Sequence, residues 1–130
     1  MWLMSETGFV SAVTHWDNPE IIVVRARDYE SLTGIADFAE QVVKHTPDND
    51  YPIRVEVPRE VFAEYVTGQI MSMTYSNYKD RMYSTRGRDF THALSDVWST
   101  MHQVETARYP EQEEEKKSVA KQLDAMYFDA

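Results

Sequence analysis

The chain has 130 residues, a formal net charge of −9 and no cysteine. This length suits a single folding domain, and the lack of cysteine excludes disulfides, thiolate metal ligands and a cysteine nucleophile. The acidic balance argues against a nucleic-acid partner. The chain begins MWLMSETG, which lacks the features of a signal peptide, and no segment approaches the ~20 apolar residues of a membrane span. We therefore expect a cytoplasmic protein without membrane contact.

Three short runs rich in β-branched and aromatic residues predict strands in the first part of the chain. They are Trp2–Met4, Phe9–His15 and Ile21–Arg27. A glycine turn at Gly8 and the turn signal Asp17-Asn18-Pro19 separate them. Because the runs follow one another closely, an antiparallel meander is their simplest pairing.

A helix over residues 30–45 and a further strand are predicted next. Asp28 or Ser31 can cap this helix, and its apolar residues recur at helical spacing as far as Val43. Tyr51–Val57 is predicted as a strand, because Ile53, Val55 and Val57 alternate with Arg54 and Glu56. This pattern is typical of a strand with one face in the core.

The remainder of the chain is predicted to be helical. One helix begins at Pro58, where a proline suits the first turn, a short one covers about residues 76–83, and a longer one follows. The first and third of these helices each carry an apolar stripe. The stripes consist of Val61, Phe62, Tyr65, Val66, Ile70 and Met73, and of Phe90, Leu94, Val97, Trp98, Met101 and Val104.

Pro110 ends the third helix and begins a tail of different composition. Glu111–Lys117 is almost entirely charged, and four apolar or aromatic residues then recur at helical spacing. These four are Val119, Leu123, Met126 and Tyr127. Two alternatives stay open for this amphipathic segment: it docks on its own domain, or it docks on another chain.

Together these elements predict an α+β fold. We expect an antiparallel sheet of about four strands with helices packed on one face, in the order β-β-β-α-β-α-α-α, plus a short C-terminal helix. Residues 1–109 would form a single domain, and residues 110–130 a charged tail.

The strongest candidate for a binding site is a set of arginines on the strands. Arg25 and Arg27 lie two residues apart and share one face, and Arg54 likewise opposes the apolar residues of its strand. His15 lies beside the neighbouring turn. Guanidinium groups suit carboxylates and phosphates, so these four residues predict an anion or acidic-partner site. The alternative is that the arginines pair with acids of the same domain and only solvate the sheet.

A second candidate is the segment Tyr75–Arg81, which gathers aromatic and basic side chains at a helix start. Its candidate contact residues are Tyr75, Asn77, Lys79 and Arg81. Helix starts attract anions and aromatic side chains stack on bases, but the acidic Asp80 argues against nucleic acid. The alternative is a helix junction that pins the tyrosines into the core.

No recognised catalytic or metal-binding pattern is present. The four glycines form neither a dinucleotide fingerprint nor a phosphate loop, the four histidines lack ligand spacing, and Ser76-x-x-Lys79 stands without its companion motifs. We therefore expect no cofactor, no metal and no identifiable catalytic residue. An enzymatic role is left open but is disfavoured.

Four segments resemble a group of small uncharacterised proteins of actinobacteria and their phages. They are GFVSAVTH at 8–15, VVRAR at 23–27, DYPIRVEVPREVFA at 50–63 and YSNYKDR at 75–81. The resemblance covers about residues 1–105. It implies a phage or actinobacterial setting, in which small proteins often act by binding a host protein, and it implies no reaction.

The resulting functional hypothesis is a non-enzymatic binding or regulatory protein that uses its open sheet face to contact a protein partner. The first alternative is a small-anion or nucleotide-binding protein using Arg25, Arg27 and Arg54. The second is a structural or assembly role through the C-terminal tail, which includes a homodimer.

Overall fold

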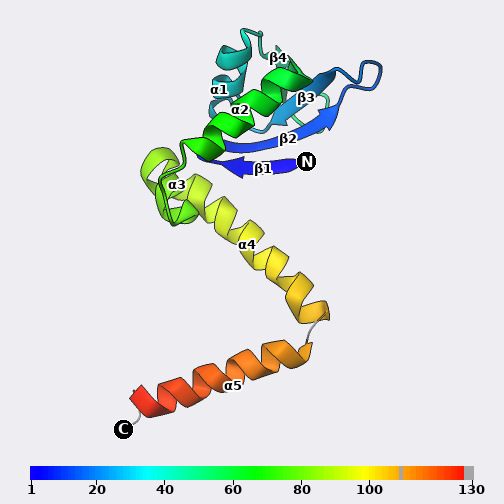
Figure 1. Ribbon diagram of the computed structural model, residues 1–130. Helices are drawn as coiled ribbons and strands as arrows, with labels where there is room; N and C mark the ends of the chain where they lie inside the picture. The colour runs from blue at the N-terminus through cyan, green and yellow to red at the C-terminus, as the bar shows by residue number, and fades with distance from the viewer. Residues whose placement is uncertain (109, 128–130) are drawn as a thin grey trace. The chain divides into compact units, whose positions relative to one another are not determined.

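The computed structural model describes the backbone of residues 1–108 and 110–127, and the side-chain surroundings of residues 1–107 and 115–126. Its fold is α+β, as the sequence predicts. The sheet has five antiparallel strands in the spatial order β1-β2-β3-β5-β4 (Figure 1). Their bounds are Trp2–Ser5 (β1), Gly8–Thr14 (β2), Ile21–Ala26 (β3), Lys44–His45 (β4) and Ile53–Pro58 (β5).

Five helices accompany the sheet among the described residues. Their bounds are Glu30–Ala39 (α1), Arg59–Met71 (α2), Tyr78–Arg86 (α3), Arg88–Arg108 (α4) and Pro110–Tyr127 (α5). The chain divides into two compact units, an N-terminal unit, Met1–Arg86, and a C-terminal unit, Gly87–Ala130. Pro110, where composition places the start of the tail, lies within the C-terminal unit.

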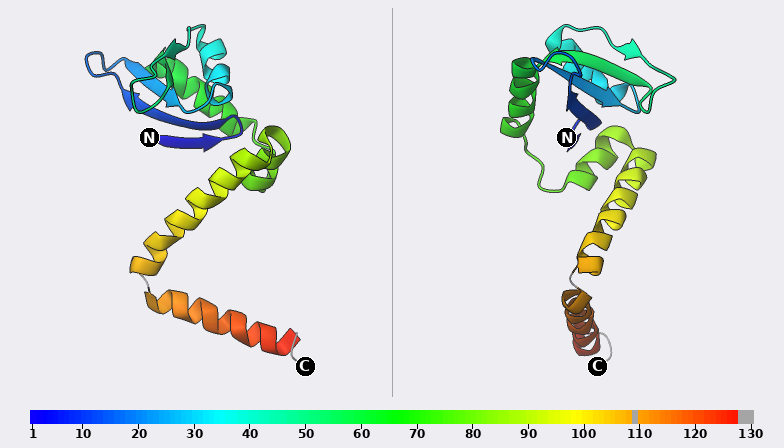
Figure 2. Two further views of the ribbon diagram at one scale, coloured as in Figure 1. Left: turned by 180° about the vertical axis from the view of Figure 1, so that it is seen from behind. Right: turned by 90° about the vertical axis from the view of Figure 1, so that its right-hand side faces the viewer.

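The core of the N-terminal unit lies between the sheet and the helices α1 and α2. Alternate strand residues point to this side, because successive side chains of a strand face opposite ways. Figure 2 shows the sheet and these two helices from two further sides. The buried residues that form the core are Val10, Ala12, Ile22, Val24, Ala26, Leu32, Ile35, Ala36, Ile53, Val55, Val57 and Phe62.

The helix predicted over residues 30–45 is too long. Helix α1 ends at Ala39, and Glu40 takes the left-handed conformation with φ 55°. Its N–H bonds the carbonyl of Asp37, and the N–H of Gln41 bonds the carbonyl of Ala36, which is the Schellman pattern of helix ends. The chain thus turns early enough for Lys44–His45 to add a fifth strand beside β5.

Both ends of the helix predicted to begin at Pro58 also differ from the prediction. Pro58 belongs to strand β5, where it pairs with Ile21, and helix α2 starts one residue later. At the other end, α2 stops at Met71, so Met73 lies outside it, and Ile70 is exposed rather than part of the core. The short helix predicted to about residue 83 extends to Arg86, and only Gly87, with φ 86°, separates α3 from α4.

Candidate functional site

Arg25 and Arg54 lie directly opposite each other on the sheet face that α1 and α2 leave uncovered, called here the open face. Strand β3 pairs with β5 so that these two residues are cross-strand partners. On the same transverse row, Ser11 is the partner of Arg25 and Lys44 that of Arg54. The strand alternation therefore brings Arg25 and Arg54 to one face, as predicted from their spacing.

The loop between β4 and β5 folds over these arginines. Tyr51 is buried, and its ring lies 4.8 Å from the guanidinium carbon of Arg25 and 4.6 Å from that of Arg27. The carboxylate of Asp50 lies 3.5 Å from Arg25 and 3.8 Å from Arg54. The alternation of the strands suggested that these arginines lie on an open face. In the structure, Asp50 and Tyr51 of the same chain cover them.

The hydrogen bonds of the two opposed arginines are unequal. Arg25 donates to the Ser11 hydroxyl at 2.7 Å. Arg54 donates from Nε to the Thr46 hydroxyl at 3.1 Å, but its Nη2 is buried and has no hydrogen-bond acceptor among the described residues. The side chains are only 19% and 20% exposed, so both guanidinium groups depend on protein acceptors rather than on bulk water. We call Arg25, Arg27, Arg54 and Asp50 the arginine cluster.

His15 belongs to a separate set of contacts. Its Nδ1 accepts the backbone N–H groups of Asp17 and Asn18, both at 3.1 Å. Its Nε2 lies 3.5 Å from a carboxylate oxygen of Glu56, which also binds Lys44 at 3.2 Å. Within the described part of the chain, no hydrogen bond or ion pair joins His15 to the arginine cluster, and its bonds to Asp17 and Asn18 order the β2–β3 turn.

The segment Tyr75–Arg81 docks helix α3 on the turn between β1 and β2. The Tyr78 hydroxyl donates to the carbonyl of Ser5 at 2.9 Å, and Arg81 donates from Nε to the carboxylate of Glu6 at 2.7 Å. Asn77 accepts the N–H of Asp80 at 3.0 Å and so caps the helix. These contacts are those of a structural junction, and they leave Lys79 as an exposed side chain of α3.

Burial is the main cause that raises the pKa of Tyr78 to about 12, and the neighbouring Tyr75 adds to the rise. Arg86 acts in the opposite direction. The two tyrosine rings lie 6.0 Å apart. The Tyr78 hydroxyl, which donates to the carbonyl of Ser5, therefore keeps its proton to a higher pH than an ordinary tyrosine does.

Arg86 is the central residue that sequence reasoning missed. Its side chain is only 9% exposed and bonds the carbonyl of Thr7 at 2.8 Å and the carboxylate of Glu30 at 3.0 Å. It also pairs with the carboxylate of Asp28. Asp28 was predicted to cap the following helix, and it does accept the N–H of Ser31 at 3.3 Å. Nothing local in the sequence marks Arg86, because its partners lie more than fifty residues away.

Helix α4 carries an apolar row with the spacing 4-3-4-3. The row is Phe90, Leu94, Val97, Met101 and Val104. The last three form an exposed stretch, here the α4 seam, with 36% to 58% of each residue accessible. This spacing is that of helices that pack along one another. The α4 seam is thus an apolar helix face without a described cover.

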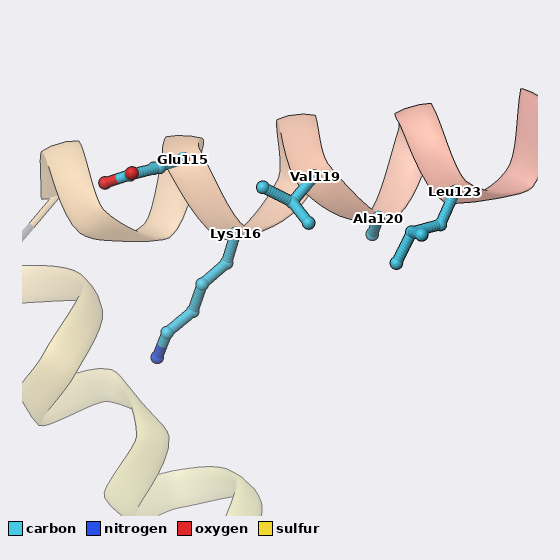
Figure 3. A pocket seen from close by; sticks show the side chains of 5 residues that line it. All are labelled: Glu115, Lys116, Val119, Ala120 and Leu123. Atoms are coloured by element: carbon cyan, nitrogen blue, oxygen red, sulfur yellow. The ribbon is translucent and has the colours of Figure 1, made fainter.

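Helix α5 carries a second row of the same kind. Val119, Leu123 and Met126, here the α5 seam, follow the spacing 4-3 and are 47% to 66% exposed. The α5 seam residues Val119 and Leu123 line an open groove of ≈ 510 Å³ together with Lys116. Figure 3 shows these side chains on α5. Lys116 reaches α4, where its Nζ lies 2.6 Å from a carboxylate oxygen of Glu105. Hydrogen bonds from Lys116 and then His102 lower the pKa of Glu105.

The described residues offer no metal site and no membrane span. No group of three or more carboxylate or imidazole side chains within residues 1–107 and 115–126 could hold a metal ion. No described helix is both long enough and apolar enough to cross a bilayer.

No protein-family model matches the chain, and neither does any curated protein or solved structure compared with it.

Proposed function

We propose that this chain is a non-enzymatic binding protein that assembles with a second copy of itself through α4 and α5. The observation that carries the proposal is the pair of seams, two exposed apolar rows with coiled-coil spacing on consecutive helices. The proposal takes up the assembly role that the sequence left as an alternative. It extends the contact surface from the tail to α4.

The seams suit a helical partner better than a small ligand. An apolar face of this spacing buries itself by interlocking with the side chains of another helix. A helix left alone in water gains little stability, since most helical stability in proteins comes from packing an apolar face. The C-terminal unit therefore has a physical reason to associate.

A second copy is the occupant we favour, because the unit offers two seams on two linked helices. Two such helix pairs would give the four helices of a bundle, with both seams of each copy inside. One flank of the α4 seam supports close approach, since Ala93, Thr100 and Ala107 recur there every seven residues and are small and uncharged. A closed two-fold pair is also the commonest form of protein assembly.

The test is the mass of the full chain in solution, measured by light scattering over a concentration series. We expect two chains per particle for the wild type and one for Met101→Glu and Leu123→Glu, since each places a charge in a seam. Ser99→Glu and Ser118→Glu are matched controls on the same helices outside the seams, and both should keep the dimeric mass.

Two outcomes would contradict the proposal. A wild-type mass of one chain at all concentrations would leave the seams to another protein or to the chain's own N-terminal unit. An equal loss of mass in the seam variants and their controls would show that added charge, rather than seam burial, governs assembly.

A cytoplasmic location and a phage or actinobacterial setting are part of the proposal and rest on the sequence alone. Capture of a host protein by the open face also stays a prediction. The part of that face on β1 and β2 supports it most, because Trp2 of β1 is exposed and packs edge-on against Phe9 of β2 at 5.6 Å. Tryptophan is enriched at binding hot spots. Arg25 and Arg54 support it less, because Asp50 and Tyr51 cover them.

A further inference from the structure

Two positive charges face each other across β3 and β5 in the arginine cluster. Like charges at directly opposite positions of an antiparallel pair repel each other, and Arg25 and Arg54 hold such positions. Both side chains are about four-fifths buried, so water screens the repulsion only in part. An anion between or beside the two guanidinium groups would offset this repulsion.

The chain itself supplies one carboxylate to these arginines, and that carboxylate lies too far away for short hydrogen bonds. Asp50 is the one carboxylate in contact with these arginines among the described residues, at 3.5 Å from Arg25 and 3.8 Å from Arg54. Charge-assisted hydrogen bonds between such groups are normally about 2.7–2.9 Å long. Arg25 and Arg54 therefore share a single carboxylate, which leaves an excess of positive charge. Arg27 bonds the backbone carbonyl of Asp50 at 3.3 Å rather than its carboxylate.

A specific donor is also left without an acceptor. Nη2 of Arg54 is buried and makes no hydrogen bond within the described residues, although a buried, charged N–H group without an acceptor is costly. Its nearest counter-charge, Asp50, is itself 65% exposed and accepts the N–H of Tyr51 at 3.1 Å. The cluster thus combines an unsatisfied donor with a weakly held internal carboxylate.

We propose that the arginine cluster is a binding site for a doubly charged oxyanion of the phosphate class, which takes the place of the Asp50 carboxylate. The ligand's oxygens would accept hydrogen bonds from Nη2 of Arg54 and from Nη1 of Arg25, which now faces Asp50 at 3.5 Å. Its two negative charges would match the two positive charges of Arg25 and Arg54. Tyr51 keeps Arg25 and Arg27 in place by packing against both guanidinium groups. Asp50 acts as an internal competitor that holds the site when no ligand is bound.

The site is independent of the seams, because every residue in it belongs to the N-terminal unit. Failure of self-assembly would therefore leave this proposal intact, and the reverse holds as well. Phosphate is favoured over a dicarboxylate because its charges sit on one centre, as the opposed positions of Arg25 and Arg54 require.

The test is a titration of the full chain with inorganic phosphate, followed by NMR of backbone amides and arginine Nε–H groups. Sodium chloride at equal ionic strength is the reference, and succinate is a parallel arm. We expect saturable shifts at Arg25, Arg54 and Asp50 with phosphate. Asp50→Asn should bind phosphate more tightly, by roughly fivefold or more, because the competing carboxylate is gone.

Variants at Arg54 tie the binding to the cluster. Arg54→Gln should abolish the saturable shifts, and Arg54→Lys should weaken them while keeping the charge, since an ammonium group lacks the planar fork. Arg88→Gln removes an exposed arginine of the C-terminal unit and should bind phosphate as the wild type does. Circular dichroism confirms that each variant is folded.

Several results would overturn the proposal. Shifts in wild type and Asp50→Asn no larger than those with chloride would show that the cluster is a purely internal ion-pair network. Undiminished binding by folded Arg54→Lys and Arg54→Gln would place the phosphate elsewhere. Weaker binding by Asp50→Asn would mean that Asp50 is no competitor, and tighter binding of succinate than of phosphate would refute the ligand class.

Discussion

Arg86 occupies the space that a side chain on residue 8 would need. A Cβ atom built on Gly8 would lie 2.6 Å from Nη1 of Arg86 and would also collide with the hydroxyl of Ser31. Gly8 has φ 135°, a backbone conformation that other residues rarely adopt. The anchoring of α3 by Arg86 therefore depends on a glycine at position 8, in the turn between β1 and β2.

We expect Gly8→Ala to lower the free energy of unfolding by about 2 kcal/mol or more, because strain and collision act together. Urea denaturation followed by circular dichroism measures the change. Gly68→Ala in α2 is the matched control, since a Cβ there meets nothing within 4 Å. It should be neutral or stabilise the protein by about 0.5–1 kcal/mol, as alanine favours helices over glycine. Equal effects of the two substitutions would contradict the packing described for Gly8.

Arg86→Met keeps most of the side-chain length but removes its charge from Asp28 and Glu30. Because Asp28 is partly exposed and Glu30 largely exposed, we expect a loss of only about 1–3 kcal/mol. Hydrogen exchange should quicken in α3, which loses its bond to the carbonyl of Thr7. Arg88→Met, at an exposed position, should leave stability and exchange in α3 unchanged.

Tyr78 makes the free energy of unfolding fall at high pH. Its pKa is raised to about 12 from an ordinary value of 10.0, so the unfolded chain releases this proton before the folded one does. The stabilisation is fully present below pH 10 and is lost as the pH rises through about 12. Ultraviolet titration should show one late-ionising tyrosine in the folded protein. Tyr78→Phe should remove that late transition and cost about 1 kcal/mol at neutral pH for the lost hydrogen bond to Ser5.

Glu40→Gly should make the protein more stable, although it weakens helix propensity in general. Glu40 is exposed and ends α1 in the left-handed conformation with φ 55°, which glycine adopts without steric cost. We expect a gain of about 0.5–1 kcal/mol in the free energy of unfolding, measured by thermal or urea denaturation. Glu40→Ala is the control and should give no gain; a gain of the same size would point to removal of the charge instead.

Most of the sheet could be predicted because strand residues alternate over short distances. The runs around Val10, Val24 and Val55 each carry an apolar face, and all three lie in the core. The length of α1 could not be predicted, because Val42 and Val43 continue the helical spacing of the apolar residues. The helix ends in a Schellman turn at Glu40, where no glycine marks the end in the sequence. The two-residue strand β4 is too short to leave any pattern, and it exists only because β5 offers it an edge.

By itself, the sequence determined the α+β class, the shared face of Arg25 and Arg54, and the apolar seams of α4 and α5. These follow from periods of two and of three to four residues, which depend on neighbours along the chain. Only the tertiary structure decided that Asp50 and Tyr51 cap the arginines and that Arg86 anchors α3. These partners of Arg25, Arg27 and Arg86 come from segments 23 to 79 residues away, whereas Asp50 lies four residues before Arg54. Ion pairing depends on distance in space, which no local period records.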